Sequence, residues 1–424
     1  MKLLTRVISP FLFVLLAVGA AGQGIRSVAP NGSGLSVERL ERIGALMNDH
    51  VAKGRIAGAV GLIYRRGKVG YFETYGFQDK ETSAPMRKDT IFRMYSMTKP
   101  ITGVAVLMLY EEGKFALSDP VSKYLPELGN MKVAVVETDP KSGKKTRYVV
   151  PTQREITILD LLRHTSGIDY RGPEDADGKP IYEKLGTNST DQTVGDMVKK
   201  ISQAPLVHQP GTMWEYGLSM DVLARLVEVV SGKPYDKFLE ERIFKPLGMV
   251  DTGYTVPPGK ANRFAKLYAP DAQTIKPFTG PAQSAYLKPA VNFGGGSQSV
   301  STASDYLRFC TMLLNGGELD GVRILSRKSV ELMSADHLLD MPRGVDLMGP
   351  GYGFGLTVAV SRGVGRTGTA GSVGEYFWGG AAGTRFWIDP KEQMIGVFLI
   401  QILPHTNLTY GSQFRQLAYL AISD

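Results

Sequence analysis

The sequence predicts an α/β fold of the α+β type, with one antiparallel sheet flanked by helices and a mostly helical domain inserted between its halves. Alternating strand patterns lie near both ends of the chain, at 56–76 and from Gly353 onward. Helical patterns dominate the residues between them. The 424 residues are enough for two or three domain-sized units or for one large composite fold.

The composition, with 43% hydrophobic and 21% charged residues, is that of a globular protein with a full core. The formal net charge of +8 is spread along the chain without a dense Lys/Arg run, so nucleic acid is not an expected partner. The single cysteine, Cys310, lies on an apolar helical stripe and is expected to be a buried packing residue. The five histidines lie far apart, so no metal or other cofactor is expected.

Residues 1–22 have the plan of a secretory signal peptide. Lys2 and Arg6 precede an apolar run from Phe11, and small residues follow at 19–22. The apolar run is shorter than the roughly 20 residues that a membrane span needs, although an uncleaved anchor is the alternative. We therefore expect cleavage after residue 20, 21 or 22 and a periplasmic or secreted protein without stable membrane association.

The first half of the mature chain alternates helices with two hairpins. The predicted elements are a helix over 36–53, two strands joined at Arg65-Arg66-Gly67, an apolar helix over 98–112, a hairpin over 132–150 and a short helix over 155–167. The hairpin lies between helices and is expected to be an insertion. A polar loop from Arg171 to Thr190 follows the short helix.

The second half begins with helices and ends with strands. The predicted elements are helices over 213–230, 235–247 and 302–315, strands over 354–360, 384–390 and 393–401, and a last helix over 414–422. The stretch D389-P-K-E joins the last two strands as a hairpin turn. We expect residues 23–95 and 297–424 to form the α/β domain and residues 96–296 the mostly helical domain.

The stretch R-M-Y-S-M-T-K-P-I-T-G places Ser96 and Lys99 one turn apart where the apolar helix begins. Backbone N–H groups at a helix N-terminus can stabilise an oxyanion, and a partly desolvated lysine there is expected to have a lowered pKa and to accept the serine proton. Alone, the pattern favours a helix-capping serine beside a solvated lysine. A second S-x-x-K, Ser142 to Lys145, lies in a polar loop and is not expected to be catalytic.

Two later stretches could complete such a site. Tyr216, in W-E-Y-G-L-S-M-D, precedes a helix and could relay a proton, or be an ordinary half-buried aromatic residue. The stretch E375-Y-F-W-G-G-A-A-G offers a strand edge with little side chain, against which a substrate could lie. The backbone N–H of Ala381 could be the second oxyanion donor, opposite that of Ser96, unless the glycines serve packing alone.

The order S96-M-T-K99, Y216-G-L218 and W378-G-G380 resembles the S-x-x-K, Y-x-N and K-T-G elements of the serine β-lactamase and penicillin-binding-protein superfamily. The stretches L-L-R-H-T-S-G-I at 161–168 and G-G-G-S-Q-S-V-S-T-A-S-D at 294–305 are similar to further landmarks of that superfamily. The resemblance covers nearly the whole mature chain and is closest to the class C β-lactamase-like carboxylesterases, called family VIII esterases. It implies a β-lactamase/DD-peptidase-like fold.

The resemblance implies that Ser96 is the nucleophile, Lys99 the general base and Tyr216 the proton relay to the leaving alcohol, with the last two roles exchangeable. Leu218 stands where the β-lactamases have Asn, and Trp378, before Gly379 and Gly380, where they have Lys. Both changes replace a polar partner with an apolar surface. They favour neutral esters over carboxylated peptides and β-lactams, and W-G-G is common in the esterase branch.

We therefore expect a serine carboxylesterase that hydrolyses short-chain acyl esters, with slow hydrolysis of some cephalosporins as a side activity. Trp378 and the loop from Arg171 to Thr190 are expected to shape the acyl or alcohol pocket. A class C-like β-lactamase or D-Ala-D-Ala peptidase, and a non-catalytic penicillin-binding or sensing protein, remain as alternatives on the same fold. The expected partner is a small-molecule ester, and the oligomeric state stays open.

Overall fold

The structure is a computed structural model that describes residues 26–175, 177–405 and 408–424. The expected signal peptide, residues 1–22, lies outside the described residues, and the proposed division into two domains stays a prediction. Among the helices of the described ranges, none is long and apolar enough to cross a bilayer.

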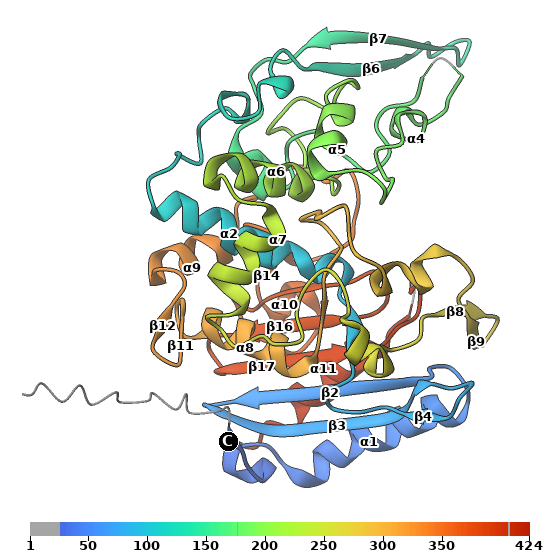
Figure 1. The fold of residues 1–424 in the computed structure, drawn as a ribbon, viewed down its shortest axis with the longest axis vertical. Coiled ribbons are helices and arrows are strands. Elements are labelled where there is room, and N and C mark those ends of the chain that lie inside the picture. The colour runs from blue at the N-terminus through green and yellow to red at the C-terminus, as the bar shows by residue number, and fades with distance from the viewer. Residues whose placement is uncertain (1–25, 176, 406–407) are drawn as a thin grey trace, which may run out of the picture.

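A nine-stranded sheet joins the two ends of the chain (Figure 1). Its order is β1-β3-β2-β17-β16-β15-β14-β13, with β4 beside β3. The strands are β1 (Arg26–Ser27), β2 (Gly58–Arg65), β3 (Lys68–Asp79), β4 (Ala84–Pro85), β13 (Tyr352–Phe354), β14 (Ala359–Ser361), β15 (Tyr376–Gly379), β16 (Arg385–Asp389) and β17 (Met394–Leu399). Antiparallel pairing of β17 with β2, with Leu399 opposite Val60, confirms the sheet predicted from both termini.

Helices cover both faces of this sheet, which is why its central strands are buried throughout. Strand β16 shows the alternation: Phe386 contacts Tyr306 of α8 (Ala303–Leu314) at 5.2 Å between ring centroids. The next residue, Trp387, contacts Phe414 of α11 (Tyr410–Leu420) at 5.9 Å. Helix α1 (Val37–Ala52) packs beside α11 on the same side. Two covered faces require apolar side chains on both sides of a strand.

The middle of the chain is mostly helical, as predicted, and lies above the sheet in Figure 1. Its helices are α2 (Thr98–Glu111), α3 (Ile158–Leu162), α4 (Ile181–Leu185), α5 (Val194–Ile201), α6 (Ser219–Ser231) and α7 (Tyr235–Leu239). Residues 98–109 of α2 are all buried, so this helix is apolar all round and runs through the core. A hairpin of β6 (Lys132–Thr138) and β7 (Lys145–Pro151) projects from the helical part.

Short elements complete the described chain. Three small strand pairs are β5 (Phe92–Arg93) with β10 (Val300–Ser301), β8 (Tyr268–Asp271) with β9 (Thr274–Pro277), and β11 (Glu318–Leu319) with β12 (Val322–Arg323). Helix α9 (Arg327–Ser334) precedes β13, and α10 (Val364–Thr367) lies between β14 and β15. Strand β5 lies immediately before the stretch that contains Ser96.

Several predicted elements are wrong in extent. The short helix over 155–167 is confined to α3, Ile158–Leu162, and the last helix, predicted over 414–422, is α11, Tyr410–Leu420. The single strand over 354–360 is a tight turn between β13 and β14, because Thr357 adopts a positive φ of 79°. The helix over 235–247 is α-helical only to Leu239 and continues as a π turn, Glu240–Phe244. The helix over 213–230 begins only at Ser219, because the preceding backbone bonds elsewhere: the N–H of Glu215 donates to the carbonyl of His164.

Asp160 organises the segment that carries the L-L-R-H-T-S-G sequence. Its side chain is fully buried at the start of α3, where Thr157 and Asp160 cap the helix reciprocally. Arg154, Arg163 and Thr165 also donate to its carboxylate, at 2.5–3.1 Å. Burial alone would raise the pKa of Asp160, but the hydrogen bonds from Arg154 and Thr157 lower it from 3.8 to about 2.

We predict that Asp160→Asn lowers the free energy of unfolding by about 2 kcal/mol at neutral pH, the equivalent of the lowered pKa. This stabilisation is fully present above pH 3.8, the unfolded value, and disappears as the pH falls towards 2. Urea unfolding of both proteins between pH 2 and pH 7 would measure it. A difference in stability that does not shrink on acidification would contradict the assignment.

Candidate active site

Lys99 is fully buried in the first turn of α2, and its ammonium group has three partners. Its Nζ donates to the carbonyl oxygen of Gly296 at 2.7 Å and lies 3.1 Å from both Ser96 Oγ and the Tyr170 hydroxyl. A charge removed from water is tolerated only where hydrogen bonds replace its hydration. The three partners come from separate segments, and one of them is the predicted nucleophile.

Ser96 lies in a 3-10 turn, Tyr95–Met97, that leads directly into α2. The N-cap of α2 is Met97, and no side chain caps this helix end. The alternative interpretation of Ser96 as a helix-capping serine is therefore wrong. Its hydroxyl is half-buried and lies against the amine of Lys99, as the catalytic interpretation requires.

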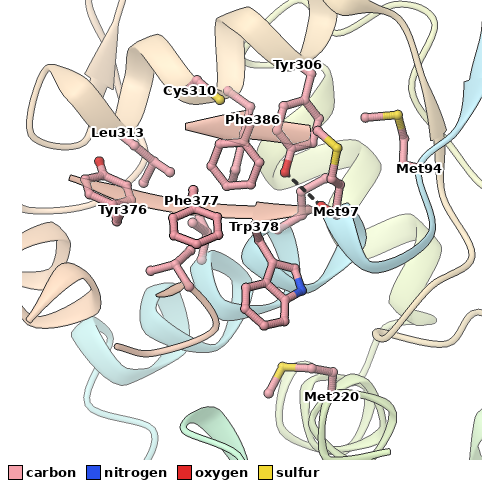
Figure 2. Packing of buried hydrophobic residues seen from close by; sticks show 14 of the residues in the cluster. Met94, Met97, Met220, Tyr306, Cys310, Leu313, Tyr376, Phe377, Trp378 and Phe386 are labelled. Carbon is pink, nitrogen blue, oxygen red and sulfur yellow. Dashed lines mark hydrogen bonds between the residues drawn. The ribbon is translucent and has the colours of Figure 1, made fainter. Parts of the chain in front are cut away.

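The backbone of this turn is strained immediately before Ser96. Tyr95 has a φ of 46°, a left-handed conformation that costs energy for any residue other than glycine. Two hydroxyl groups hold the turn in place. Thr98 Oγ1 donates to the Tyr95 carbonyl at 2.7 Å, and the Tyr306 hydroxyl donates to the Met97 carbonyl at 2.8 Å, the dashed line in Figure 2. The sheet-covering helix α8 thus fixes the position of Ser96.

The glycine run Gly294–Gly296 supplies acceptors to the core on the other side of Lys99. Each carbonyl accepts one hydrogen bond: Gly294 from the Tyr254 hydroxyl, Gly295 from Thr102 Oγ1, and Gly296 from Lys99 Nζ. The buried carboxylate of Asp221 accepts from the Gly296 N–H at 3.2 Å. A Cβ at Gly296 would lie 2.7 Å from that carboxylate, so only glycine allows this approach.

Tyr216 stands next to Lys99 on an aromatic support. Lys99 Nζ lies 4.6 Å from the centre of the Tyr216 ring, and the Nε1–H of Trp378 donates to the Tyr216 hydroxyl at 3.0 Å. The rings of Trp214 and His164 pack against Tyr216 at 5.9 and 4.7 Å between centroids. The predicted trio of Ser96, Lys99 and Tyr216 is thus brought together, with Trp378 orienting the phenol.

His164, from the H-T-S-G sequence, is part of this support. Its side chain is fully buried, and burial together with the charge of Lys99 lowers its pKa well below 6.5. The ring is therefore neutral at physiological pH. Ser166, two residues later, exchanges a hydrogen bond with Ser219 of α6 at 2.9 Å. The motif thereby ties α3 to the helix that follows Tyr216.

The expected lowering of the Lys99 pKa is wrong. Burial acts to lower it, but Tyr170, Tyr216 and Asp221 act to raise it, and the net shift is upward. The helix N-terminus is outweighed because the amine is surrounded by oxygen atoms at hydrogen-bond distance. Lys99 is therefore an ammonium ion in this structure, and its three N–H groups match its three acceptors.

Tyr170 is a site residue that the motifs did not single out. It follows the H-T-S-G sequence by three residues, and its hydroxyl reaches Lys99 directly, whereas Tyr216 contacts Lys99 through its ring. Burial raises the pKa of Tyr170 more than Lys99 lowers it, so the phenol keeps its proton. Its position after a family landmark is the only signal in the sequence that could have indicated it.

The W-G-G stretch forms a strand edge that ends beside the segment of Ser96. Strand β15 is internal at Tyr376 and Phe377, which pair with both β14 and β16, but Trp378 and Gly379 pair with β16 alone. The predicted edge is therefore confined to these last two residues. Beyond them, Gly380 approaches the nucleophile segment so closely that a Cβ would lie 2.3 Å from the carbonyl oxygen of Met94.

Ala381 follows this contact in an exposed turn. The N–H of Gly380 is not available to a substrate, because it donates to the Thr384 carbonyl at 2.7 Å. The carbonyl of Ala381 lies 2.8 Å from His405 Nδ1. Within the described residues no acceptor is bonded to the N–H of Ala381. This group has the free hydrogen that a second oxyanion donor needs.

Leu218 lies in the core at the N-cap of α6, with 3% of its surface exposed. Its predicted role in substrate binding stays a prediction. Cys310 is fully buried in α8, as expected, and burial raises the pKa of its thiol. The loop that follows Tyr170 lines a half-open cavity of about 350 Å³, between residues 170 and 189.

Comparison with known proteins gives consistent matches over this fold. A family model described as Beta-lactamase matches residues 43–419. The chain is 36% identical to Protein Rv1367c of Mycobacterium tuberculosis over 360 residues, which are 83% of this chain and 87% of that protein. It is 29% identical to Esterase EstB of Burkholderia gladioli over 368 residues, 82% of this chain and 86% of that protein.

Among solved structures, the chain is similar to "EstCE1, a hydrolase with promiscuous acyltransferase activity". The TM-score is 0.77 at 27% sequence identity, and the match covers 91% of this chain and 98% of the other. The likeness therefore extends over the sheet as well as the helical part.

We predict that Gly380→Ala lowers kcat/KM for a short ester by about 10²-fold, the usual effect of a misplacement near 1 Å. The added Cβ would meet the carbonyl of Met94 and Thr384 Oγ1, both at 2.3 Å, and would push the Ala381 turn away from Ser96. The control is Gly365→Ala, because a Cβ there meets no atom within 4 Å. Full activity in Gly380→Ala would show that this approach is not needed.

Proposed function

The chain belongs to the Beta-lactamase family, and on that premise we propose that it is a serine carboxylesterase that hydrolyses short-chain acyl esters through an acyl-enzyme on Ser96. Its likeness to Esterase EstB and to EstCE1 supports an ester hydrolase of the β-lactamase-like, family VIII esterase type. The observation that carries the proposal is the contact of Ser96 Oγ with the buried Lys99 Nζ at 3.1 Å.

In the acylation step, Ser96 Oγ attacks the ester carbonyl carbon and loses its proton. Because Lys99 already carries three protons, we assign the base to Tyr216 acting as the phenolate, whose oxygen takes the Ser96 proton and becomes the phenol. The Lys99 ammonium group, 4.6 Å from the centre of the Tyr216 ring, stabilises the negative charge of that phenolate. Tyr216 is thus the base and not the relay, which is the second of the two role assignments predicted for Lys99 and Tyr216. The Nε1–H of Trp378 donates to the same Tyr216 oxygen and thus favours negative charge on it.

The tetrahedral intermediate places a negative charge on the former carbonyl oxygen. The backbone N–H groups of Ser96 and Ala381 are the donors assigned to this oxyanion. Gly380 supports the second donor, because its lack of a side chain lets the turn approach the nucleophile segment. Water then hydrolyses the acyl-enzyme through the same groups in reverse roles.

Apolar residues support a preference for neutral substrates. Trp378 replaces the lysine that holds the carboxylate of β-lactams in the superfamily, and its indole N–H is occupied by Tyr216. Leu218 replaces an asparagine amide with a buried apolar side chain. Weak hydrolysis of cephalosporins is compatible with this site as a side activity. The N-terminal signal pattern supports a periplasmic or secreted location.

We expect Ser96→Ala to abolish hydrolysis of p-nitrophenyl acetate, because no other group can carry the acyl intermediate. Lys99→Ala and Tyr216→Phe should each lower kcat by at least about 10²-fold, the usual range for acid–base groups. The matched control is Ser142→Ala, since this serine belongs to the second S-x-x-K, which lies in the exposed turn between β6 and β7. Substantial turnover by Ser96→Ala would refute the nucleophile assignment.

A second prediction concerns substrate class. Purified protein should hydrolyse p-nitrophenyl acetate and butyrate with a far higher kcat/KM than nitrocefin, because the site offers an apolar surface at Trp378 and Leu218. Faster turnover of nitrocefin would favour the β-lactamase alternative instead. A stable β-lactam adduct without turnover of any ester would favour a penicillin-binding or sensing protein.

A further inference from the structure

The cavity of about 350 Å³ beside Tyr170 is not used by the steps described above. Its lining residues are Tyr170, Arg171, Pro180, Tyr182, Glu183, Gly186, Asn188 and Ser189. The volume is in the range of small-molecule sites in proteins. Tyr170 connects this cavity to the catalytic centre, because its hydroxyl lies 3.1 Å from Lys99 Nζ.

The geometry of the intermediate indicates which part of the ester lies on this side. The carbon on Ser96 Oγ carries an oxyanion, an acyl group and the leaving alcohol oxygen. The oxyanion is directed to the turn after β15, where the Ala381 N–H is free. The alcohol oxygen needs a proton as its bond breaks. Lys99 and Tyr170, both in the helical part of the chain, form a pair of donors there, because Lys99 Nζ lies 3.1 Å from both Ser96 Oγ and the Tyr170 hydroxyl.

We propose that this cavity is the alcohol subsite and that Tyr170 delivers the proton to the leaving alcohol, an inference that rests on the proposed esterase function. When the C–O bond breaks, its electron pair stays on the alcohol oxygen, which takes the Tyr170 proton. Lys99 replaces that proton on Tyr170 and takes up the proton that the Tyr216 phenolate accepted from Ser96, so that Tyr216 returns to the phenolate and Lys99 to the ammonium ion. The acyl group remains on Ser96 Oγ, and all atoms and charges balance.

The walls of the cavity indicate the chemistry of the alcohol. Tyr170, Pro180 and Tyr182 contribute flat, apolar surfaces, which suit an aromatic or alicyclic group. Arg171 and Glu183 both line the cavity, and their opposite charges give no net preference for an ionic ligand. The substrate class is therefore an ester of a short acyl group with a bulky, uncharged alcohol.

The subsite is tested with ethyl acetate and benzyl acetate, which form the same acetyl-enzyme and release alcohols of different bulk. Ser189→Trp fills the cavity from an exposed position, and the matched control is Thr190→Trp, exposed in the same loop but not a lining residue. Ser189→Trp should lower kcat/KM for benzyl acetate by about 10-fold or more and leave ethyl acetate nearly unchanged. Thr190→Trp should affect neither substrate.

Two outcomes of this experiment would overturn the subsite. One is an unchanged benzyl acetate rate in Ser189→Trp. The other is a loss confined to ethyl hexanoate relative to ethyl acetate, which would assign the cavity to the acyl group. Asn188→Trp, from a second exposed lining residue, provides the same test should Ser189→Trp not fold. Failure of the esterase function itself is visible separately, because the unmodified protein would then hydrolyse none of these esters.

The proton-donor role is tested with Tyr170→Phe and two leaving groups. A benzyl alkoxide needs a proton to leave, whereas p-nitrophenolate leaves as a stable anion. Tyr170→Phe should therefore lower kcat/KM for benzyl acetate by about 10²-fold but for p-nitrophenyl acetate only a few-fold. Equal losses on both esters would contradict proton delivery and would leave Tyr170 with a structural role only. Tyr216→Phe provides the comparison, since it should slow both esters.

Discussion

The complete burial of a lysine ammonium group is the constraint from which the rest of the site follows. Lys99 has no exposed surface, and a buried cation without partners would cost several kcal/mol. The chain meets this cost with oxygen atoms from three segments: Ser96, Tyr170 and the carbonyl of Gly296. The fold that brings these segments together is thus also the fold that builds the proposed catalytic centre, because the same contacts stabilise the charge and position Ser96.

Two backbone features bring the neighbouring segments within hydrogen-bond distance of Lys99. Tyr95 adopts a left-handed φ of 46° so that the chain turns sharply from β5 into α2 with Ser96 facing the amine. The run Gly294–Gly296 approaches from the other side, where the carboxylate of Asp221 leaves no room for a Cβ at Gly296. Strain and crowding of this kind persist only where the surroundings hold them. Here α8 holds the turn through the hydroxyl of Tyr306.

Trp378 and Leu218 stand where the family pattern has Lys and Asn, and these apolar residues affect the structure of the site as well as the choice of substrate. Trp378 offers no cation to the substrate, but its indole N–H donates to the Tyr216 hydroxyl. The phenol is thus oriented without a charged neighbour on the sheet. Lys99 then remains the one cation bonded to both the nucleophile and a phenol in the described part of the site. The arrangement suits the attack on an uncharged ester and gives a substrate carboxylate no partner at position 378.

The sheet built from both termini, the long apolar helix after Ser96 and the order of Ser96, Tyr216 and Trp378 could be predicted from the sequence, because local periodicity and short motifs record these features. The sequence did not determine the start of α6, the turn at Thr357 or the charge of Lys99. Tyr170 and Gly296 lie 71 and 197 residues from Lys99, and no local pattern contains that separation. Such contacts depend on the tertiary structure, which sets the oxygen atoms that surround the Lys99 amine. These oxygen atoms outweigh the helix N-terminus in fixing the charge of Lys99.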